Sequence, residues 1–472
     1  MPDTADFRSF AAKMHNAGLR PELIDVFQDY YHQLASGYTG KLSEDEIRPL
    51  DQANDLLHQE AITEATGAQG RELLPKTVMI KLNGGLGTSM GMSYAKSLVE
   101  VKQGRNFLDV IVMQCNGCEG NVQYSIPLAL MDSFATHKET VSYLQEQGVR
   151  VGQDVFSFVQ HKFPKIRQDT LEPVRYPEDP ELEWNPPGHG DVYAALETSG
   201  LLNQLLSDGY RYAFVSNSDN LGAVVDSRLL GVLAESGAPF MIEVCRRTAA
   251  DTKGGHLARH VDGRLILREI AQCPDEELDA FQDVQRYKYF NTNNIWIDLQ
   301  QLRDFIDANG FPKLPIIVNP KTVNPRDADS TPVYQIETAM GAAVAAFSGS
   351  LGVQVSRDRF IPVKKTNDLL AVWSDCYIFT EDCRIVPNPR RQLETIIITL
   401  DSTYYKNIDQ LKSRFQYGAP SLLECSSLTI RGDIAFGADV VCRGEVVLEN
   451  RGAHQVVVPD GTVLEGQQIW EA

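Results

Sequence analysis

The sequence lacks any apolar run near the ~20 residues that a membrane-spanning helix needs. Its first residues, MPDTADFRSFAAKM, introduce charge early and show no apolar core of a secretory signal. Basic residues are also scarce: 44 Lys and Arg stand against 63 Asp and Glu, a formal net charge of −19. Nucleic-acid-binding proteins usually carry a basic surplus. We therefore expect no membrane segment and no nucleic-acid partner.

Cysteine is sparse and irregularly placed, with eight residues in 472. This arrangement does not form a disulfide framework. Cys115 and Cys118 make one CxxC pair, but no second pair or nearby histidine pair completes a zinc site. We expect reduced thiols and a cytoplasmic location. The apolar share of 43% is ordinary for a globular protein. A length of 472 residues fits about three compact units.

The pattern of apolar residues changes twice along the chain. Residues 1–73 show apolar positions at helical spacing, and Pro21 suits the first turn of a second helix. Residues 74–366 alternate short apolar runs with amphipathic stretches, which predicts an α/β domain with buried, mainly parallel strands and helices on both faces. The predicted strands are TVMIKL (77–82), DVIVMQ (109–114), YAFVSN (212–217), FMIEVC (240–245) and NIWIDL (294–299).

Residues 367–472 form a third region with a period of six. The repeating aliphatic positions are Leu422, Leu428, Ile434, Val440, Val446, Val458 and Leu464. A period of six matches neither a helix nor simple strand alternation. It predicts a small parallel β-helix, in which each coil adds one aliphatic side chain to a shared column. We expect this unit to cap the catalytic domain or to join subunits into a homo-oligomer.

The strongest local motif is KLNGGLGTSMGMSYAKS, residues 81–97, which places four glycines directly after a predicted strand. Glycine lets the backbone approach a phosphate closely. The spacing fails the dinucleotide GxGxxG fingerprint by one residue, because glycine returns only at Gly91. It also fails the P-loop pattern, because Ala95 precedes Lys96. The glycines alone leave a phosphate-binding loop and an unliganded turn equally open.

Further motifs favour the phosphate-binding alternative. With the glycine loop, their content and order resemble the eukaryotic-type UTP–glucose-1-phosphate uridylyltransferases, the UDP-glucose pyrophosphorylase family. They are FVQHKFPKI (158–166), WNPPGHGDVY (184–193), FVSNSDNLGA (214–223), TKGGHL (252–257), REIAQCP (268–274), FNTNNIWI (290–297), QIETAMGAA (335–343) and RFIPVKKTNDLL (359–370). The family's loop usually ends Gly-Pro-Lys-Ser, whereas this chain has Tyr94-Ala95-Lys96-Ser97. Loop length is unchanged, so Lys96 keeps its place.

The resemblance implies a fold and a reaction. The fold is a Rossmann-like nucleotidyltransferase domain over 74–366, preceded by the helical segment and followed by a left-handed parallel β-helix. The reaction joins glucose 1-phosphate to UTP with Mg²⁺, giving UDP-glucose and pyrophosphate. Because the attacking phosphate oxygen is already anionic, catalysis depends on positioning and on cations that neutralise charge. The alternatives are another sugar phosphate, such as N-acetylglucosamine 1-phosphate, or a non-catalytic nucleotide sensor or scaffold.

The resemblance also implies site residues. Lys96 and Lys364 are the expected catalytic residues, and Asp219 is the expected Mg²⁺ ligand. The expected UTP-binding residues are Leu82, Asn83, Gly84, Gly85, Lys96, Gln160, Gly188, Asp219 and Lys364. The expected sugar-phosphate-binding residues are Gly85, His189, Asn217, Ser218, Asp219, Glu269 and Asn293.

Each main assignment has a structural alternative. A lysine such as Lys96 usually lies on a solvated surface, and Asp219 follows a strand where an Asx turn is common. Lys365 adjoins Lys364, so the register of that pair is open by one residue. We expect His189 to bind phosphate without transferring a proton.

Overall fold

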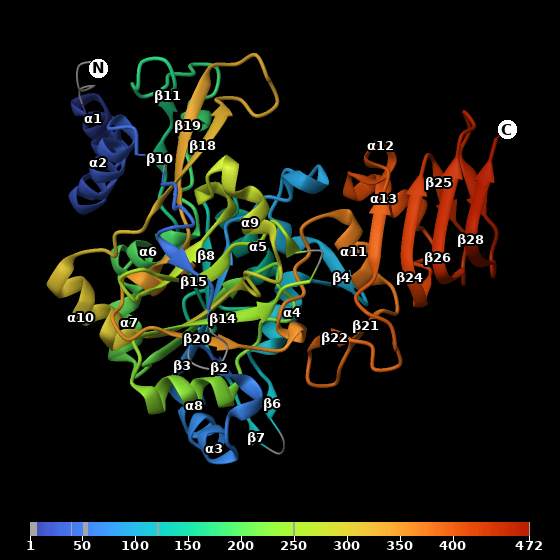
Figure 1. Cartoon of the computed structure of the whole chain (residues 1–472), viewed down its shortest axis with the longest axis horizontal. Helices are drawn as coiled ribbons and strands as arrows, with labels where there is room; N and C mark the ends of the chain where they lie inside the picture. The colour runs from blue at the N-terminus through green and yellow to red at the C-terminus, as the bar shows by residue number, and fades with distance from the viewer. Residues whose placement is uncertain (1–6, 39, 51–54, 120–121, 249–250, 472) are drawn as a thin grey trace.

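The computed structural model describes residues 7–471 except 39, 51–54, 120–121 and 249–250. A mixed, mainly parallel sheet forms the centre of the larger body, which confirms the α/β prediction (Figure 1). Its main path runs β2-β20-β14-β17-β13-β3-β8-β9, and only β17 pairs antiparallel with its neighbours. The bounds are β2 Leu57–His58, β20 Leu351–Gln354, β14 Phe240–Arg246, β17 Tyr289–Asp298, β13 Tyr212–Asn217, β3 Thr77–Asn83, β8 Leu128–Asp132 and β9 Val155–Val159.

Helices cover both faces of this sheet because its strands are apolar on both sides. Val78 and Ile80 of β3 pack with α6, α7 and α10 on one face, whereas Met79 packs with α4, α5 and α8 on the other. The helices are α1 Arg8–Asn16, α2 Pro21–Ala35, α3 Glu64–Leu73, α4 Phe107–Gln114, α5 His137–Glu146, α6 Val192–Thr198, α7 Leu201–Ser207, α8 Ser227–Ser236, α9 Leu278–Gln282, α10 Leu299–Asn309, α11 Thr366–Trp373, α12 Ser402–Tyr405 and α13 Ile408–Arg414.

Four of the five predicted strands are confirmed, as β3, β13, β14 and β17. The strand predicted over 109–114 is wrong, because these residues belong to helix α4. Asn106 and Asp109 form a reciprocal capping box there, each side chain accepting a hydrogen bond from the other's backbone N–H. A short apolar run does not distinguish a buried strand from a buried helix, and the cap decided this one.

The amino-terminal segment is helical only in part. Pro21 begins α2 as predicted, and Phe10, Met14 and Phe27 are buried where the helix pair meets β10 Phe163–Pro164. However, β2 extends the central sheet, and β1 Ile47–Arg48 pairs with β15 His256–His260, which also joins β16 Leu265–Arg268 and β17. The described part of residues 1–73 thus contains α1, α2 and α3 and also two short strands, which the sequence did not predict because two-residue strands carry no periodic signal.

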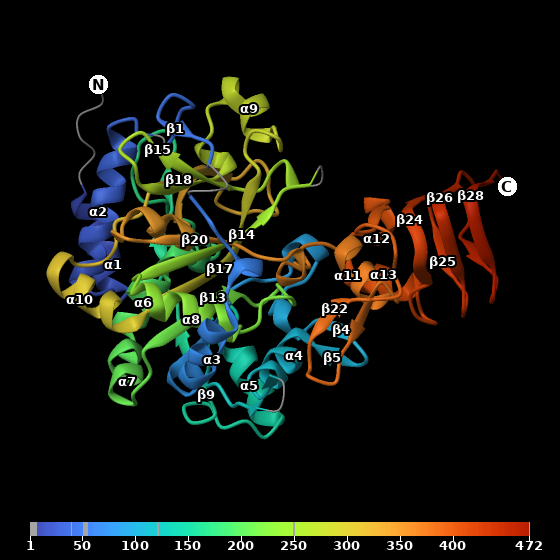
Figure 2. The ribbon, with the colours of Figure 1, turned by 60° about the horizontal axis from the view of Figure 1, so that its bottom comes forward.

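Short hairpins and a small sheet lie around the centre. The N-terminal helices stand beside the β11-β19-β18 sheet in both ribbon views (Figures 1 and 2). The remaining bounds in the larger body are β4 Glu100–Lys102, β5 Arg105–Asn106, β6 Cys118–Glu119, β7 Val122–Gln123, β11 Ile166–Arg167, β12 Trp184–Asn185, β18 Ile316–Thr322 and β19 Pro332–Thr338.

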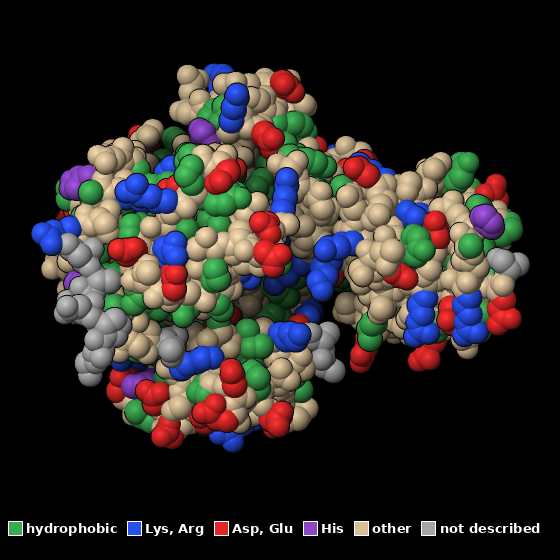
Figure 3. Space-filling model, turned by 90° about the horizontal axis from the view of Figure 1, so that it is seen from above, with side chains coloured by type: hydrophobic (Ala, Val, Ile, Leu, Met, Phe, Trp, Pro, Cys, Tyr) green, Lys and Arg blue, Asp and Glu red, His purple; other side chains and the backbone are tan. Residues whose placement is uncertain are grey.

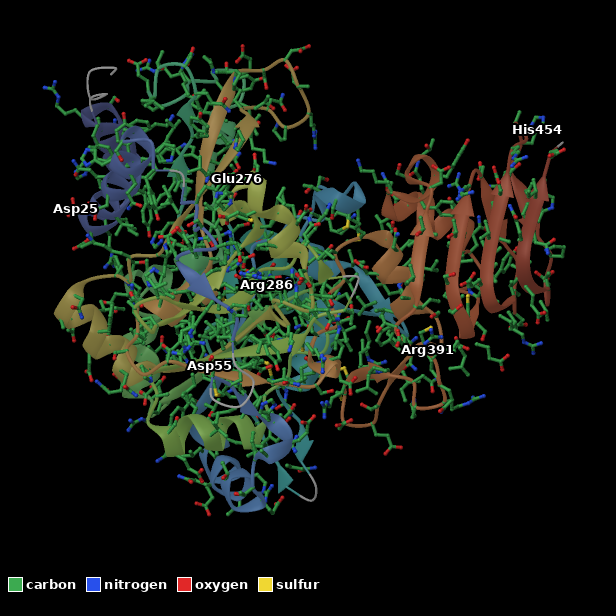
Figure 4. All side chains as sticks on the ribbon, viewed as in Figure 1. Asp25, Asp55, Glu276, Arg286, Arg391 and His454 are labelled. Atoms are coloured by element: carbon green, nitrogen blue, oxygen red, sulfur yellow. The ribbon has the colours of Figure 1, made fainter. Side chains whose placement is uncertain are left out.

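The C-terminal strands project from the larger body, with His454 near their far end (Figure 4). They lie in separate parallel sheets, β23-β24-β26-β28 and β25-β27, beside the hairpin β21-β22. All seven aliphatic residues of the six-residue repeat are buried. The left-handed β-helix itself stays a prediction. The bounds are β21 Tyr377–Phe379, β22 Ile385–Pro387, β23 Ile397–Leu400, β24 Ser421–Arg431, β25 Ile434–Phe436, β26 Val441–Asn450, β27 Val456–Val458 and β28 Val463–Trp470.

The structure also bears on two predictions made from composition, one about membrane segments and one about a zinc site. Across the described part of the chain, no helix has both the length and the apolar character to cross a bilayer. Cys115 is a buried free thiol, while the side chain of Cys118 lies outside the described residues. The expected absence of a CxxC zinc site therefore stays a prediction.

Candidate active site

The candidate site lies at the carboxyl ends of β3 and β13, which are adjacent and parallel. Ligands bind at such strand ends in open α/β sheets. A cavity of about 320 Å³ opens there. Its lining includes the predicted residues Leu82, Gly84, Gly85, Lys96, Gln160, Gly188, His189, Asn217, Ser218 and Asp219. Segments far apart in the sequence thus meet in one hollow.

Two glycines pack closely around this cavity. A Cβ on Gly84 would lie 2.5 Å from the side-chain nitrogen of Gln160, so the first arm of the loop lies directly against that amide. Gly188 has φ +78°, and a Cβ there would lie 2.5 Å from the carbonyl oxygen of Thr338. Glycine is required at Gly188, whereas a side chain at Gly84 would displace only the end of the flexible Gln160 side chain. Gly84, Gly188 and Gln160 all line the cavity.

Lys96 and Asp219 meet directly in the cavity. The Lys96 ammonium lies 2.5 Å from Asp219 Oδ2, and the two side chains are 13% and 20% exposed. A partly buried lysine paired with a carboxylate is not a solvated surface lysine, so the surface alternative is wrong for Lys96. The pair joins the glycine loop to the segment that follows β13.

Asp219 has a second carboxylate oxygen that fits a metal ion. Oδ1 is buried and has no hydrogen-bond partner among the described residues. A hard cation such as Mg²⁺ prefers carboxylate oxygen and is usually held by one or two carboxylates with substrate phosphates and water. In the described part of the chain, no group of three or more His, Cys, Asp or Glu could hold a metal. The donor set therefore fits an ion shared with phosphates, not a closed protein cage.

His189 is held as a neutral hydrogen-bond donor. Its Nδ1 accepts a hydrogen bond of 2.9 Å from the backbone N–H of Met340. Burial, together with the nearby Lys364 ammonium, lowers the pKa of His189 to about 4. A neutral ring that accepts at Nδ1 carries its proton on Nε2. His189 can thus donate to an anionic oxygen, but it is a poor proton acceptor near neutral pH.

Lys364 lies beside this site in an adjoining cavity of about 710 Å³ that also contains Glu269 and Asn293. Its ammonium is close enough to lower the pKa of both His189 and Glu269. His189 lines the first cavity with Lys96, and the effect of Lys364 on the pKa of His189 places the second cavity's lysine near it. The adjoining cavity reaches the C-terminal part, where it is lined by Arg391 (Figure 4).

Glu269 and Asn293 offer polar groups to that second cavity. Burial raises the pKa of Glu269, while a hydrogen bond from Asn291 and the charge of Lys364 oppose the rise. A Cβ on Gly255 would lie 2.4 Å from the Glu269 carboxylate, so glycine leaves room for it. Asn293 has φ +56° at an irregularity in the β14–β17 pairing, held by reciprocal bonds to Asn291. This conformation turns Asn293 out of the ladder.

Two predicted site residues, Asn83 and Leu82, make hydrogen bonds that support the walls of the cavity. The Asn83 side chain donates to Asp132 and Thr140 in a buried cluster, so it does not face the cavity. The carbonyl of Leu82 accepts from the backbone N–H of Ser218, which ties the ends of β3 and β13 together. Asn83 fits the site as a support for the loop.

The motif analysis missed two sets of buried charges beneath the site. Lys81 is fully buried and donates to Ser216 Oγ at 2.8 Å and to the carbonyl of Ala223 at 2.6 Å, on both sides of Asp219. Burial lowers its pKa to about 7. The sequence signal that could have predicted this buried group is a lysine inside an otherwise apolar strand.

The second set is the ion pair of Arg359 with Glu243, with contacts of 2.7 and 2.6 Å. The Arg359 carbonyl accepts from the side chains of Asn220 and Asn294. Two residues past Ile361, Val363 N–H donates to the carbonyl of Asp219 at 3.0 Å. The segment that carries Lys364 is thus fixed against the segment that carries Asp219. Nothing in the sequence pairs Glu243 with Arg359.

The charge on this face is distributed unevenly. The chain has a net charge of −19, yet Lys and Arg side chains gather around a hollow at the junction with the C-terminal part (Figure 3). Local positive potential of this kind raises the concentration of an anionic ligand at the mouth of a cleft.

The ring of His189 should stay neutral from pH 8 to about pH 5, because its folded-state pKa is about 4. An unfolded histidine protonates near pH 6.5. Between these values the unfolded chain binds the extra proton, so His189 lowers folding stability as the pH falls through this window. Histidine NMR, with His189→Asn to assign the signal, measures this. A titration midpoint near 6.5 would contradict the assignment.

Comparison with known proteins agrees with this geometry. A family model described as UTP–glucose-1-phosphate uridylyltransferase matches residues 24–443. The chain is 40% identical over 400 residues to that enzyme from Hordeum vulgare, covering 84% of this chain and 82% of the relative. It is 39% identical over 399 residues to the Saccharomyces cerevisiae enzyme, covering 83% and 77%.

Solved structures agree in fold over nearly the whole chain. A Leishmania major UDP-glucose pyrophosphorylase variant in complex with UDP-glucose superposes with a TM-score of 0.88 at 40% identity, covering 98% of this chain and 99% of that one. A UDP-glucose phosphorylase from Trypanosoma brucei gives 0.88 at 43% identity, covering 99% and 100%. The sequence resemblance is confirmed: this chain belongs to the UTP–glucose-1-phosphate uridylyltransferase family.

Proposed function

We propose that this chain transfers the uridylyl group of UTP to glucose 1-phosphate, giving UDP-glucose and pyrophosphate. The observation that carries the proposal is the convergence of Lys96, Asp219 and His189 on one cavity, with Lys364 on its border. Family membership supplies the reaction, and the geometry supplies a place where several phosphate groups can meet.

The reaction requires that the negative charge of the phosphates be neutralised and that the attacking oxygen be aligned with the α-phosphorus. A phosphate oxygen of glucose 1-phosphate attacks the α-phosphorus of UTP, and the bond from that phosphorus to the bridging oxygen of pyrophosphate breaks. No proton must be removed from the nucleophile. Cations and preorganised N–H donors that contact the phosphates lower the barrier. A neutral His189 with its proton on Nε2 suits the sugar phosphate as a donor.

The positions of the other predicted residues support specific contacts with the substrates. Lys96 contacts the UTP phosphates from the first cavity, and Lys364 contacts the phosphates from the adjoining one. Gln160 can read the uracil edge, because an amide offers both a donor and an acceptor. The glucose hydroxyls are assigned to Glu269 and Asn293 in the second cavity. The other predicted contacts are assigned to Leu82, Gly84, Gly85, Gly188, Asn217 and Ser218, which line the first cavity, while Asn83 supports the loop from its buried cluster.

The metal assignment follows from Asp219 Oδ1. We propose that this oxygen would hold Mg²⁺, which would supply positive charge to neutralise the substrate phosphates. Lys96, on the other carboxylate oxygen, holds Asp219 in place and faces the same phosphates. The Asx-turn alternative for Asp219 is tested below.

The domain limits 1–73, 74–366 and 367–472 and a cytoplasmic location also remain proposals. We further propose that the C-terminal sheets are coils of a left-handed β-helix that mediates homo-oligomer formation. Parallel pairing of Leu428 with Val446, and of Val441 with Val463, supports stacked coils. Val457 and Val463 are 60% and 50% exposed, which supports a contact surface at this end.

The direct test is an assay of pyrophosphate released from UTP, Mg²⁺ and a panel of sugar 1-phosphates. We expect turnover with glucose 1-phosphate above that with N-acetylglucosamine 1-phosphate. A preference for the N-acetylated sugar would replace glucose in the proposal. UTP binding without turnover on any sugar would favour a nucleotide sensor or scaffold.

Lys364→Ala should lower kcat by about 100-fold, a typical cost of removing one donor to a transition state. The KM for UTP should change by less than about threefold, because the contact matters most in the transition state. Lys365→Ala is the matched control, since the neighbouring lysine is also exposed. Steady-state kinetics of both variants decide the register. An unchanged kcat in Lys364→Ala, with a loss in Lys365→Ala, would reverse the assignment.

Asp219→Asn separates a metal ligand from a turn residue. Asparagine supports an Asx turn as well as aspartate does, but it lacks the charge that Mg²⁺ requires. We expect the variant to remain folded and to need about tenfold or more Mg²⁺ for half-maximal rate. Asp208→Asn, at an exposed position after α7, is the control. If the magnesium titration of Asp219→Asn matched that of the control, the turn alternative would be right.

A further inference from the structure

The first turn of α5 contacts both ends of the loop over residues 84–96, here called the nucleotide loop. At the near end, Thr136 Oγ1 donates to the carbonyl of Asn83 at 2.8 Å. The Asn83 side chain in turn donates to Thr140 Oγ1 at 3.0 Å. Both threonines are fully buried, so the start of the loop is fixed against this helix.

At the far end, the same helical turn reaches the loop through Glu139. The backbone N–H of Ala95 donates to Glu139 Oε2 at 2.9 Å. Ala95 is itself fully buried, so its N–H needs an acceptor. Thr136 and Thr140 hold one arm of the loop, and Glu139 holds the other.

The two arms also pair with each other. Lys96 N–H donates to the carbonyl of Gly85 at 3.1 Å, and Gly87 N–H donates to the carbonyl of Tyr94 at 3.4 Å. Leu86 and Ala95 form an antiparallel bridge between these bonds. Lys96 follows Ala95 directly, and its side chain reaches Asp219. Any shift of Ala95 therefore moves the ammonium that the proposed reaction uses.

We propose that Glu139 is a positioning residue for Lys96. It accepts the Ala95 N–H and so fixes the second arm of the nucleotide loop at a separation from the first arm that α5 sets. The role rests on the proposed function, in which Lys96 contacts the UTP phosphates. Glu139 lines neither of the two cavities described above, so its role is to position Lys96. No family motif in the sequence includes it.

The backbone geometry at Ala95 provides a test of this role. Ala95 has φ −57°, within the range that a proline ring fixes. Proline has no N–H, so a proline at this position would hold the backbone without an acceptor. Ala95→Pro should then make Glu139 dispensable. In the presence of Glu139 the ring would press on its carboxylate, so the informative comparison is made in the Glu139→Ala background.

The experiment compares wild type, Glu139→Ala, Glu139→Gln and Glu139→Ala/Ala95→Pro. We expect Glu139→Ala to lower kcat/KM for UTP by about three- to tenfold, the scale of one partly exposed hydrogen bond to a charged acceptor. Glu139→Gln, which keeps an acceptor oxygen, should fall between wild type and Glu139→Ala. The double variant should recover to within about twofold of wild type, because proline removes the unpaired N–H. Lys138→Ala, exposed on the same helical turn, is the control.

Two results would overturn the role: an unchanged kcat/KM in Glu139→Ala, or no recovery in a double variant whose thermal midpoint matches that of Glu139→Ala. If the double variant fails to fold, the order of UTP affinities decides, and equal affinities in wild type, Glu139→Gln and Glu139→Ala reject it. Calorimetric UTP binding also separates the two proposals. Wild type that binds UTP but turns over no sugar phosphate refutes the proposed function alone, whereas wild type that binds no UTP refutes both.

Discussion

The ion pair between Lys96 and Asp219 is the interaction on which the rest of the site depends. It joins the glycine loop after β3 to the segment after β13, two strands that lie side by side and parallel. A chain of net charge −19 must gather phosphate groups, so its positive charge has to be local. Pairing Lys96 with the Asp219 carboxylate offsets part of the desolvation cost of its partly buried ammonium. The second oxygen of Asp219 then remains available to a metal.

Behind this pair lies a layer of buried charges that fixes its two halves. Lys81 bonds on both sides of the Asp219 segment, and Arg359 bonds Glu243 on the neighbouring strand β14. Removing Arg359 or Glu243 would leave an uncompensated buried charge, so this pair constrains the backbone strongly. The hydrogen bond from Val363 to Asp219 extends the constraint toward Lys364. Two lysines far apart in the sequence, Lys96 and Lys364, are thereby held on two cavities of the same face.

The sequence predicted the sheet and the glycine loop well, because buried strands and glycine spacing leave local signals. It failed at α4, where the capping residue Asn106 outweighed a run of apolar residues that reads equally as a strand. The residues that we propose to bind substrate could be predicted only through motifs whose order resembled a family. The supporting roles of Glu139, Glu243 and Arg359 could not be predicted from the sequence. Their hydrogen-bond partners are distant in the chain, and only the folded backbone brings them together.

The central claim is that Lys96 and Lys364 act on one triphosphate. A double-mutant cycle on kcat/KM, with Lys96→Ala, Lys364→Ala and the combined variant, tests it most directly. Groups that act as a unit are strongly non-additive, so the combined loss should be far smaller than the product of the two single losses. A combined loss equal to that product would mean that the two ammonium groups act independently, and it would contradict the account.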